Sequence, residues 1–539
     1  MSDGTIAERL EAAETRQPRR IDDLIDRLTR ERRLVGARRD GRAIGSAGLA
    51  DISVRGVTHD SRHVTADTLF VAVPGLHVDG HEYVDAAEAR GAAAAIVERP
   101  LPELAIPQLI VDGTRPALAS AAAWWYGDPS HELAIVGITG TDGKTTTSYL
   151  ATAALEAAGI RAGMTGTAST RIGGIQEANV EHATTPEAPE LQRALRAMAV
   201  AGDQAAVVET TSHGLALARV DAIAYDAAIL TNLTHEHLEL HGTWEAYRDA
   251  KLRLFEKLAP HLNKPLGWPA VGVVNADDPS AGAFIGVAQE ANARIVTYGT
   301  DTTADVKATR VEEDQQRLRI AFDAPSGSGV VDLHLVGRFN VHNALAVVAL
   351  GEGIGLDPAA VRDGLASVPV VPGRMERIDA GQPFGVIVDF AHSPASLQTV
   401  LDLLAPIAAS RGGGLIAVFG SAGERDTAKR PLMGRVAGER TRIVVVTDED
   451  PRGEDRDRII EAIAVGAEAA GKRRDHDLLL IADRRAAIDA AIERARPGDI
   501  VLLAGKGHEQ AIIGPDGPVP WDERAEAAAA LDRAGYRDR

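Results

Sequence analysis

The segment Glu132-Leu-Ala-Ile-Val-Gly-Ile-Thr-Gly140-Thr-Asp-Gly-Lys-Thr-Thr-Thr147 decides the fold, because an apolar stretch passes through glycines directly into a helix-forming run. In such a strand–turn–helix unit, backbone N–H groups and the helix N-terminus hold phosphate. Lys144 supplies a positive charge for the β- and γ-phosphates, and the Thr145 hydroxyl can reach a metal ion. Ile138 occupies the first glycine position of the strict P-loop pattern, so Gly137 and Gly140 must form the turn. The segment predicts an ATP site.

Apolar strands alternate with helix-forming segments outward from this loop. We expect a helix from Lys144 to about Ala158, followed by strands at residues 205–209, 226–232 and 271–275. Such alternation implies a mostly parallel sheet. Five later apolar stretches predict a doubly wound, Rossmann-like domain. They lie at residues 385–390, 415–420, 441–448, 477–483 and 499–505.

These patterns predict an α/β chain of three domains, in line with roughly 150 residues per domain. We expect a charged N-terminal extension, a small N-terminal α/β domain, a central P-loop ATPase-like domain and a C-terminal Rossmann-like domain. Their boundaries are placed at residues 1–45, 46–130, 131–370 and 371–539. Within the extension we expect a helix near Ile21 to Leu28 and a flexible lead-in. Residues 367–376, rich in Pro and Gly, form the joint before the last domain.

Composition excludes several classes of function. The net charge of −19 repels phosphate backbones, so nucleic acid is not expected as a partner. The absence of cysteine excludes disulfides and thiolate chemistry. No apolar run approaches the roughly 20 residues that span a bilayer, and the charged N-terminus does not resemble a signal peptide. We therefore expect a cytoplasmic protein without membrane insertion.

Polar side chains follow several of the expected strands. Glu209 ends the strand at residues 205–209, where an acid commonly meets the metal of a phosphate loop. His213 and His237 follow strand ends too, although Mg²⁺ prefers oxygen ligands and a single His is more often a packing residue. Lys251 lies on an amphipathic helix, where composition alone favours a solvated lysine.

From about Val57 to Glu509 the motifs resemble, in order, those of the Mur ligase family, and within it the branch that adds a diamino acid. Residues 140–147 resemble the ATP loop of that family, which usually has Asn at the position of Asp142. Residues 337–344 resemble the segment whose second Asn lies near the adenine. Asp389-Phe-Ala-His392 resembles a segment in which Tyr usually stands at the position of Phe390.

The resemblance implies ATP as co-substrate and Mg²⁺ as cofactor. The implied ATP-binding residues are Gly140, Thr141, Asp142, Gly143, Lys144, Thr145, Thr146, Asn343 and Arg374. The implied metal ligands are Thr145, Glu209, His237 and Lys251, the last as a carbamylated lysine, which replaces the solvated lysine expected from composition. Lys144, Lys251 and His213 are the implied catalytic residues.

The resemblance also implies a UDP-linked muramoyl dipeptide as substrate, bound partly by a uridine-binding N-terminal domain. The implied contacts are Ser61, Thr184, Thr185, Thr211, Ser212 and Arg219. Arg425, Asp450, Arg452, Gly505 and Glu509 are the implied contacts of the incoming amino acid. The chain is expected to act as a monomer.

The added amino acid depends on residues 449–452, Glu-Asp-Pro-Arg, where diaminopimelate-adding members carry Asp-Asn-Pro-Arg. Arg452 can hold a carboxylate with two parallel hydrogen bonds, which favours diaminopimelate slightly. Ionised Asp450 only accepts hydrogen bonds and therefore suits an ammonium, so lysine and ornithine stay open.

The implied reaction passes through an acyl phosphate, and the C-terminal domain is expected to rotate about residues 367–376 to deliver the amino acid. Three alternatives remain. The chain could be a folylpolyglutamate-synthase-like ligase, a P-loop kinase, or a catalytically silent binding relative. The last is suggested by the departures at Asp142, Glu236 and Phe390.

Overall fold

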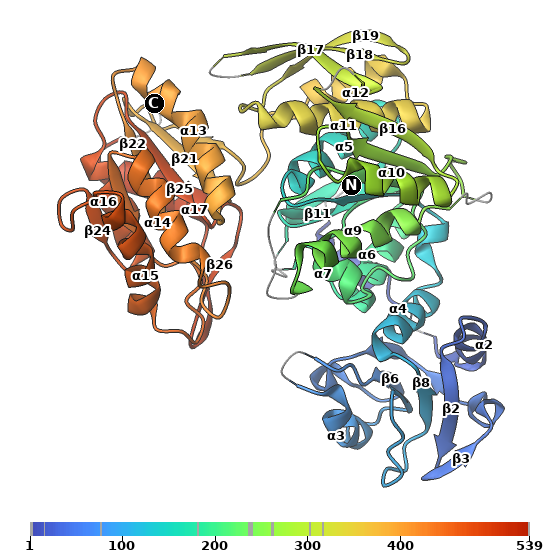
Figure 1. Cartoon of the computed structure of the whole chain (residues 1–539). Coiled ribbons are helices and arrows are strands. Elements are labelled where there is room, and N and C mark those ends of the chain that lie inside the picture. The colour runs from blue at the N-terminus through green and yellow to red at the C-terminus, as the bar shows by residue number, and fades with distance from the viewer. Residues whose placement is uncertain are drawn as a thin grey trace.

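The computed structural model forms three α/β bodies, as the sequence predicts (Figure 1). The structure describes residues 4–15, 17–75, 78–179, 183–234, 241–259, 264–300, 303–314 and 317–536. Figure 1 shows the N-terminal body at one end of the central body, and the C-terminal body beside the central one. No helix of the described residues is long and apolar enough to cross a membrane.

The N-terminal body is a sheet whose described strands run in the order β3-β2-β8-β7-β6-β5. Its strands β6 and β7 are wholly buried, as expected for apolar runs in a parallel sheet. Its elements are β1 (Arg19–Arg20), α2 (Asp22–Arg30), β2 (Leu34–Arg39), β3 (Arg42–Ile44), β4 (Ser53–Val54), β5 (Gly56–Thr58), β6 (Thr68–Val71), α3 (Val84–Ala89), β7 (Ala94–Val97), β8 (Gln108–Val111) and α4 (Thr114–Trp125).

The expectation for residues 1–45 needs correction. The helix near Ile21 to Leu28 is confirmed as α2, but β2 and β3 extend the N-terminal sheet and are not a lead-in. Ahead of them, α1 (Ile6–Ala12) packs on the central body, where Ile6 is buried among its apolar side chains. An ion pair from Arg193 to Glu14 holds the same segment. The start of the chain therefore ties two bodies together.

The central body surrounds a sheet whose described strands run in the order β12-β11-β10-β13-β9-β14-β15-β16-β17-β18-β19. The strands from β10 to β17 in this order are parallel, and antiparallel strands extend both ends. The strands are β9 (Ala134–Thr139), β10 (Ala162–Thr165), β11 (Ser169–Ile172), β12 (Ile175–Ala178), β13 (Ala205–Glu209), β14 (Ala227–Leu230), β15 (Val271–Asn275), β16 (Arg294–Gly299), β17 (Val306–Glu313), β18 (Leu318–Ala324) and β19 (Gly327–Leu333).

Helices cover both faces of this sheet because its parallel strands are apolar on each side. They are α5 (Lys144–Ala157), α6 (Ala188–Val200), α7 (Ser212–Ala216), α9 (Trp244–Glu256), α10 (Ala281–Glu290), α11 (Phe339–Ile354) and α12 (Pro358–Ala366). The helix predicted from Lys144 is confirmed as α5, which begins directly at the end of the glycine turn.

The C-terminal body has the doubly wound sheet that the five apolar stretches predict, with parallel strands in the order β21-β25-β22-β23-β24. The carboxyl ends of parallel strands share one edge, so the loops after β22, β23 and β25 meet there. The elements are β20 (Glu376–Ile378), β21 (Gly385–Asp389), α13 (Pro394–Ser410), β22 (Leu415–Phe419), α14 (Lys429–Arg440), β23 (Ile443–Val446), α15 (Arg456–Ala469), β24 (Leu478–Leu480), α16 (Arg484–Arg494), β25 (Ile500–Ala504), β26 (Ala511–Gly514), β27 (Gly517–Pro520) and α17 (Glu523–Arg533).

Candidate active site

The glycine turn between β9 and α5 is held in a conformation that excludes other residues. Gly140 has φ +148°, and a Cβ there would collide with the Thr231 hydroxyl. Gly143 has φ +84°, and a Cβ would lie 2.5 Å from Oδ1 of Asn343. The backbone therefore passes close to its neighbours, and the amides of Thr141 and Asp142 donate to Asn232 at 2.8 and 3.0 Å.

Hydrogen bonds to its carbonyls fix the turn further. The Thr231 hydroxyl donates to the carbonyl of Asp142 at 2.6 Å. Nζ of Lys144 donates to the carbonyls of Gly140 and Thr141, at 3.0 and 2.8 Å. Lys144 is thus folded over the loop, at the place where a phosphate would sit.

Lys251 corrects the expectation drawn from composition. It is only 1% exposed, and its Nζ donates to the carbonyl of Gly140 at 2.7 Å. The same ammonium lies over the ring of Tyr247, 4.6 Å from the centroid. The residue therefore faces the phosphate loop and not solvent.

Glu209 is the buried carboxylate next to the loop, with 1% of its surface exposed. Its Oε2 accepts hydrogen bonds from the hydroxyls of Thr145 and Thr167, at 3.1 and 2.8 Å. Burial raises the pKa of Glu209, while Lys144, Thr167 and Arg374 oppose that rise. A cation placed beside this carboxylate would relieve its desolvation.

Thr145 and Glu209 fit a magnesium ion, because they bring two oxygen ligands to the phosphate loop. Within the described part of the chain, no three His, Asp or Glu side chains gather to hold a metal alone. Phosphate oxygens and water would have to complete the shell, which is common for Mg²⁺. The predicted ligand His237 lies outside the described residues. His213 is on α7, half-buried, with its ring 5.8 Å from that of His241.

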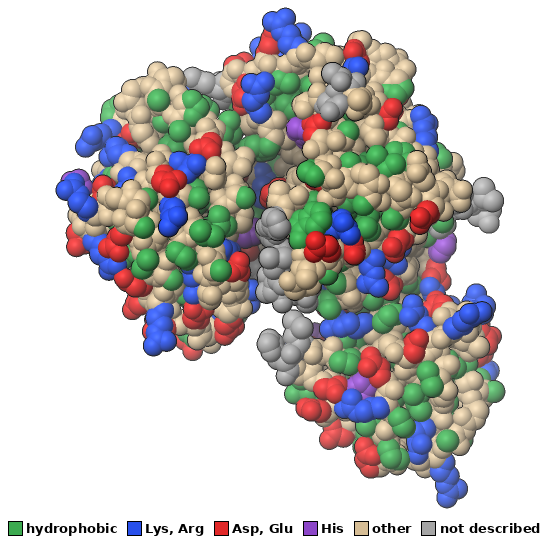
Figure 2. Space-filling view, viewed as in Figure 1, with side chains coloured by type: hydrophobic (Ala, Val, Ile, Leu, Met, Phe, Trp, Pro, Cys, Tyr) green, Lys and Arg blue, Asp and Glu red, His purple; other side chains and the backbone are tan. Residues whose placement is uncertain are grey.

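A cavity of about 710 Å³ opens from the loop into the space between the central and C-terminal bodies. Figure 2 shows the surface hollowed where these two bodies meet. Six of the predicted ATP-binding residues line this cavity: Asp142, Gly143, Thr145, Thr146, Asn343 and Arg374. Apolar and aromatic side chains, including Leu335, Val336 and Phe339, line another part and suit a purine base.

Arg374 reaches both bodies from the joint. Its guanidinium lies 4.7 Å from the ring centroid of Phe390, and its Nη2 is 3.3 Å from Oγ1 of Thr145. The Phe390 ring also contacts His392 and His508, at 4.6 and 4.9 Å between ring centroids. Burial, helped by nearby Arg374, lowers the pKa of His508 to about 3, so its ring is neutral.

Most of the residues predicted to bind the dipeptide lie together beside Glu209. The Thr185 hydroxyl donates to the Glu209 carbonyl at 2.8 Å and lies 3.0 Å from that of Thr211. The Thr167 hydroxyl contacts both Thr184 and Glu209. Arg219 donates to the Thr185 carbonyl at 2.8 Å.

The two remaining predicted dipeptide contacts differ in their surroundings. Ser212 is buried next to this group, and its hydroxyl has no hydrogen-bond partner among the described residues. Ser61 lies apart, in the N-terminal body.

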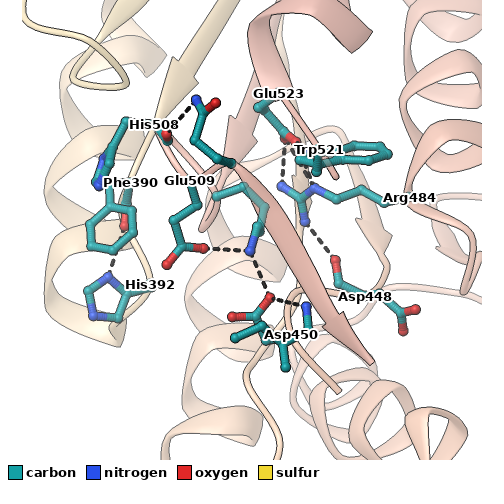
Figure 3. Close-up of polar contacts among 12 residues, drawn as sticks. Phe390, His392, Asp448, Asp450, Arg484, His508, Glu509, Trp521 and Glu523 are labelled. Atoms are coloured by element: carbon teal, nitrogen blue, oxygen red, sulfur yellow. Dashed lines mark hydrogen bonds and ion pairs between the residues drawn. The ribbon is translucent and has the colours of Figure 1, made fainter. Parts of the chain in front are cut away.

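The residues predicted to bind the amino acid lie on loops at the carboxyl edge of the C-terminal sheet, and Figure 3 shows two of them, Asp450 and Glu509. Asp450 is already engaged, because its Oδ1 accepts from Nζ of Lys506 at 2.7 Å and from the Ile513 amide at 3.0 Å. Lys506 also pairs with Glu509. Gly505 has φ +99°, which lets the chain turn after β25.

Two atoms at this edge are buried without a hydrogen-bond partner within the described residues. Glu449 is 7% exposed and its Oε2 has no hydrogen-bond partner, nor does Nε of Arg452. Arg425 lies exposed in the loop after β22. Sequence reasoning missed Glu449, Lys506 and Thr167 as site residues. The one signal that could have found any of them is the position of Lys506 between two glycines, in the segment Gly505-Lys506-Gly507.

The loop, the buried carboxylate and the cavity together define a nucleotide-dependent enzyme made of a P-loop-type body and a Rossmann-like body. Comparison with known proteins agrees. Residues 53–124, 138–351 and 373–507 match the families described as "Mur ligase family, catalytic domain", "Mur ligase middle domain" and "Mur ligase, glutamate ligase domain".

Relatives cover nearly the whole chain. A UDP-N-acetylmuramyl-tripeptide synthetase of Roseiflexus sp. is 49% identical over 90% of this chain and 95% of its own length. A UDP-N-acetylmuramoyl-L-alanyl-D-glutamate–2,6-diaminopimelate ligase of Geobacillus thermodenitrificans is 39% identical over 88% of this chain and 94% of its own length. A solved structure of a ligase with that same name has a TM-score of 0.61 and 32% identity, and the match covers 90% of this chain and 96% of that one. The chain belongs to the Mur ligase family and is an ATP-dependent ligase.

Replacing Gly140 by Ala tests the loop. The added Cβ would collide with the Thr231 hydroxyl and shift the loop, so we expect roughly 10- to 100-fold weaker binding of ATP, or about 1.4–2.8 kcal/mol. Gly159→Ala is the matched control, because Gly159 also has a positive φ but open space around it. Isothermal titration calorimetry with ATP should therefore separate the two variants. Equal affinities would contradict the role assigned to the turn.

Proposed function

We propose that the chain joins a diamino acid to UDP-N-acetylmuramoyl-L-alanyl-D-glutamate and converts ATP to ADP and phosphate. One observation carries this proposal: the phosphate loop and the group predicted to bind the dipeptide meet at Glu209. Thr145 contacts its carboxylate from the loop, and Thr185 contacts its carbonyl from the other side. A terminal phosphoryl group and a substrate carboxylate would thereby be brought together. We expect the reaction to occur in the cytoplasm, where ATP is held.

In the first half of the reaction, an oxygen of the D-glutamate carboxylate attacks the γ-phosphorus of ATP. The bond to the β,γ-bridging oxygen breaks, ADP leaves, and an acyl phosphate forms. Lys144 and Arg374 face the place where negative charge gathers on the transferred group. Catalysis at this step is mostly positioning and charge stabilisation.

Magnesium would be held by Thr145 and Glu209, and it would supply further neutralisation of phosphate charge. We keep the proposal that Lys251 is carbamylated and serves as a further metal ligand. A carbamate retains one N–H, so it can keep donating to Gly140 while adding two oxygens that face the loop. His237 remains a proposed ligand on the resemblance alone.

In the second half, the free amine of the incoming amino acid attacks the acyl carbon and phosphate leaves. Residues of the C-terminal body, among them Phe390 and His392, line the same cavity as the phosphate loop. Closure about residues 367–376 would bring the amine to the acyl phosphate and exclude water, which would otherwise hydrolyse it.

The structure favours diaminopimelate over a simple diamino acid. The objection raised by Asp450 loses its force, because the ammonium that Asp450 suits is provided by Lys506 of the same chain. Arg452 and Glu449, three residues apart, are each left with a buried atom that has no partner. A guanidinium and a carboxylate on one loop match the carboxylate and ammonium at the distal end of diaminopimelate.

The alternatives fit these observations less well. A kinase needs no site for an amino acid, and a folylpolyglutamate synthase needs no site for a uridine nucleotide. A silent relative is not favoured by the departures within the described residues. The backbone of Asp142 makes the contacts that hold the loop, and Phe390 keeps its place beneath Arg374.

The decisive experiment measures phosphate release with ATP and the UDP-linked dipeptide, with diaminopimelate, L-lysine or L-ornithine supplied separately. We expect amine-dependent phosphate release, highest with diaminopimelate, and a UDP-linked tripeptide in the mass spectrum. Phosphate bound to an isolable product without any amine would indicate a kinase. No ATP consumption with any amine would overturn the proposal.

Arg452→Met removes the guanidinium but keeps the aliphatic length. We expect KM for diaminopimelate to rise roughly 10- to 100-fold, since a hydrogen bond to a charged group contributes about 1.5–3 kcal/mol. KM for lysine should change little, because lysine has no distal carboxylate. Arg458→Met is the matched control, since this arginine lies exposed on α15. An equal rise for both amino acids would contradict the assignment of Arg452.

Glu509 predicts a pH dependence of amino-acid binding. Burial raises its pKa to about 7, although Lys506 opposes the rise, so the carboxyl is largely protonated at pH 6 and ionised at pH 8. Only the ionised form attracts an ammonium, so KM for the amino acid should fall as pH rises through 7. Glu509→Gln should abolish this dependence and leave KM for ATP unchanged. If KM for the amino acid changed with pH equally in the wild type and in the variant, Glu509 would be excluded as the cause of the pH dependence.

A further inference from the structure

Arg484 and Glu523 form an ion pair in the C-terminal body whose side chains are wholly buried. The guanidinium donates through Nε and Nη2 to Glu523, at 2.9 and 2.6 Å, and Trp521 donates to the same carboxylate at 2.7 Å (Figure 3). The pair joins the first turns of α16 and α17. No step proposed above uses it.

A buried ion pair is a poor device for stability alone, because the desolvation of two charges often exceeds their attraction. A guanidinium, however, offers five N–H donors in a fixed planar arrangement. The donors of Arg484 that do not face Glu523 reach two backbone carbonyls. Nη1 donates to the carbonyl of Asp448 at 2.8 Å, and Nη2 to that of Ala504 at 2.7 Å.

These two carbonyls directly precede the loops assigned to the amino acid. Asp448 precedes Glu449, and Ala504 ends β25 and precedes Gly505. The strands β23 and β25 are not neighbours, because β22 lies between them. No strand-to-strand hydrogen bond can therefore fix the distance between the two loops, and one guanidinium bridges them.

A glycine at the end of β22 lets the chain after β23, which Arg484 contacts, pass close by. Gly420 follows β22, and a Cβ there would collide with the carbonyl of Thr447 and lie 2.7 Å from the amide of Glu449. The chain after β23 thus rests on a residue without a side chain. Arg484 holds it there from α16, and Lys506 ties the same two loops through Asp450.

We propose that Arg484, held in place by Glu523, is a positioning residue that sets the distance between the Glu449–Arg452 loop and the Gly505–Glu509 loop, and so the binding of the incoming amino acid. This inference rests on the proposed function. The charge of Arg484 serves the same end: burial lowers its pKa, but Glu523, and beyond it Glu449 and Glu509, raise it overall. The positive charge of Arg484 therefore also attracts Glu449 and Glu509.

The test compares Arg484→Lys and Glu523→Gln with wild type. Lysine keeps the charge but cannot hold both carbonyls and Glu523 in one plane. We expect KM for diaminopimelate to rise about tenfold or more, since small misplacements of binding groups are costly. KM for ATP and for the UDP-linked dipeptide should stay within about twofold, because Glu523, Asp448 and Ala504, which Arg484 contacts, do not line the nucleotide cavity or belong to the group beside Glu209.

Hydroxylamine gives a readout that bypasses the amino-acid subsite. It attacks the acyl phosphate, forms a hydroxamate and releases phosphate, and it is too small to need either loop. We expect the variants to form hydroxamate at the wild-type rate. Folded variants in which hydroxamate formation falls together with amino-acid use would overturn the proposal.

The matched control is the neighbouring pair Arg485–Glu526, which joins the same two helices at the surface. Arg485→Lys and Glu526→Gln should leave KM for diaminopimelate unchanged. Should the single variants fold poorly, Arg484→Met with Glu523→Leu replaces the pair by apolar side chains and still lacks the two donors. An unchanged KM in that folded double variant would refute the positioning role.

The control experiment on the wild type separates this inference from the function on which it rests. Wild-type protein that forms hydroxamate but uses no diamino acid would contradict the proposed function. Wild-type protein that uses diaminopimelate, with variants that bind it equally well, would contradict only the role of Arg484.

Discussion

The central site depends on one buried negative charge, that of Glu209. A carboxylate at the end of a fully apolar strand is costly unless its oxygens are satisfied, and Thr145 and Thr167 provide that satisfaction. Gly166 has no side chain because a Cβ would collide with this carboxylate. Thr145 at the start of α5 and Thr167 in the loop after β10 therefore both direct their hydroxyls at Glu209, whose charge a bound cation would neutralise further.

Arg374 extends this electrostatic arrangement across the joint. Burial raises the pKa of Glu209 in the central body and of Asp389 in the C-terminal body, and Arg374 opposes both rises. Its guanidinium stacks on Phe390 while its tip reaches Thr145. A nucleotide entering the cavity would meet Arg374 beside the loop, so binding of phosphate and the relative position of the two bodies are physically linked.

Local patterns in the sequence were sufficient for β9, β13, β14 and β15, for the parallel strands of the C-terminal body, for α5 and for the glycine turn, because each depends on neighbouring residues. They failed where the partner is distant. Lys251 contacts a carbonyl 111 residues away, and the Ile6 amide in α1 meets Glu177, 171 residues away. An amphipathic helix with a lysine, or a charged chain start, has the same local pattern whether or not such a contact exists.

The same limit explains why the ammonium partner of Asp450 within the chain was not predicted. An isolated aspartate in place of asparagine adds a negative charge to a subsite, which by itself favours an ammonium ligand. Lys506, 56 residues later, cancels that charge and is also shared with Glu509. Glu449 and Arg452 each keep a buried atom without a partner within the described residues, and Glu449, like Asp450, differs from the family signature. The charges at this edge are thus balanced across two loops, and no single motif contains both.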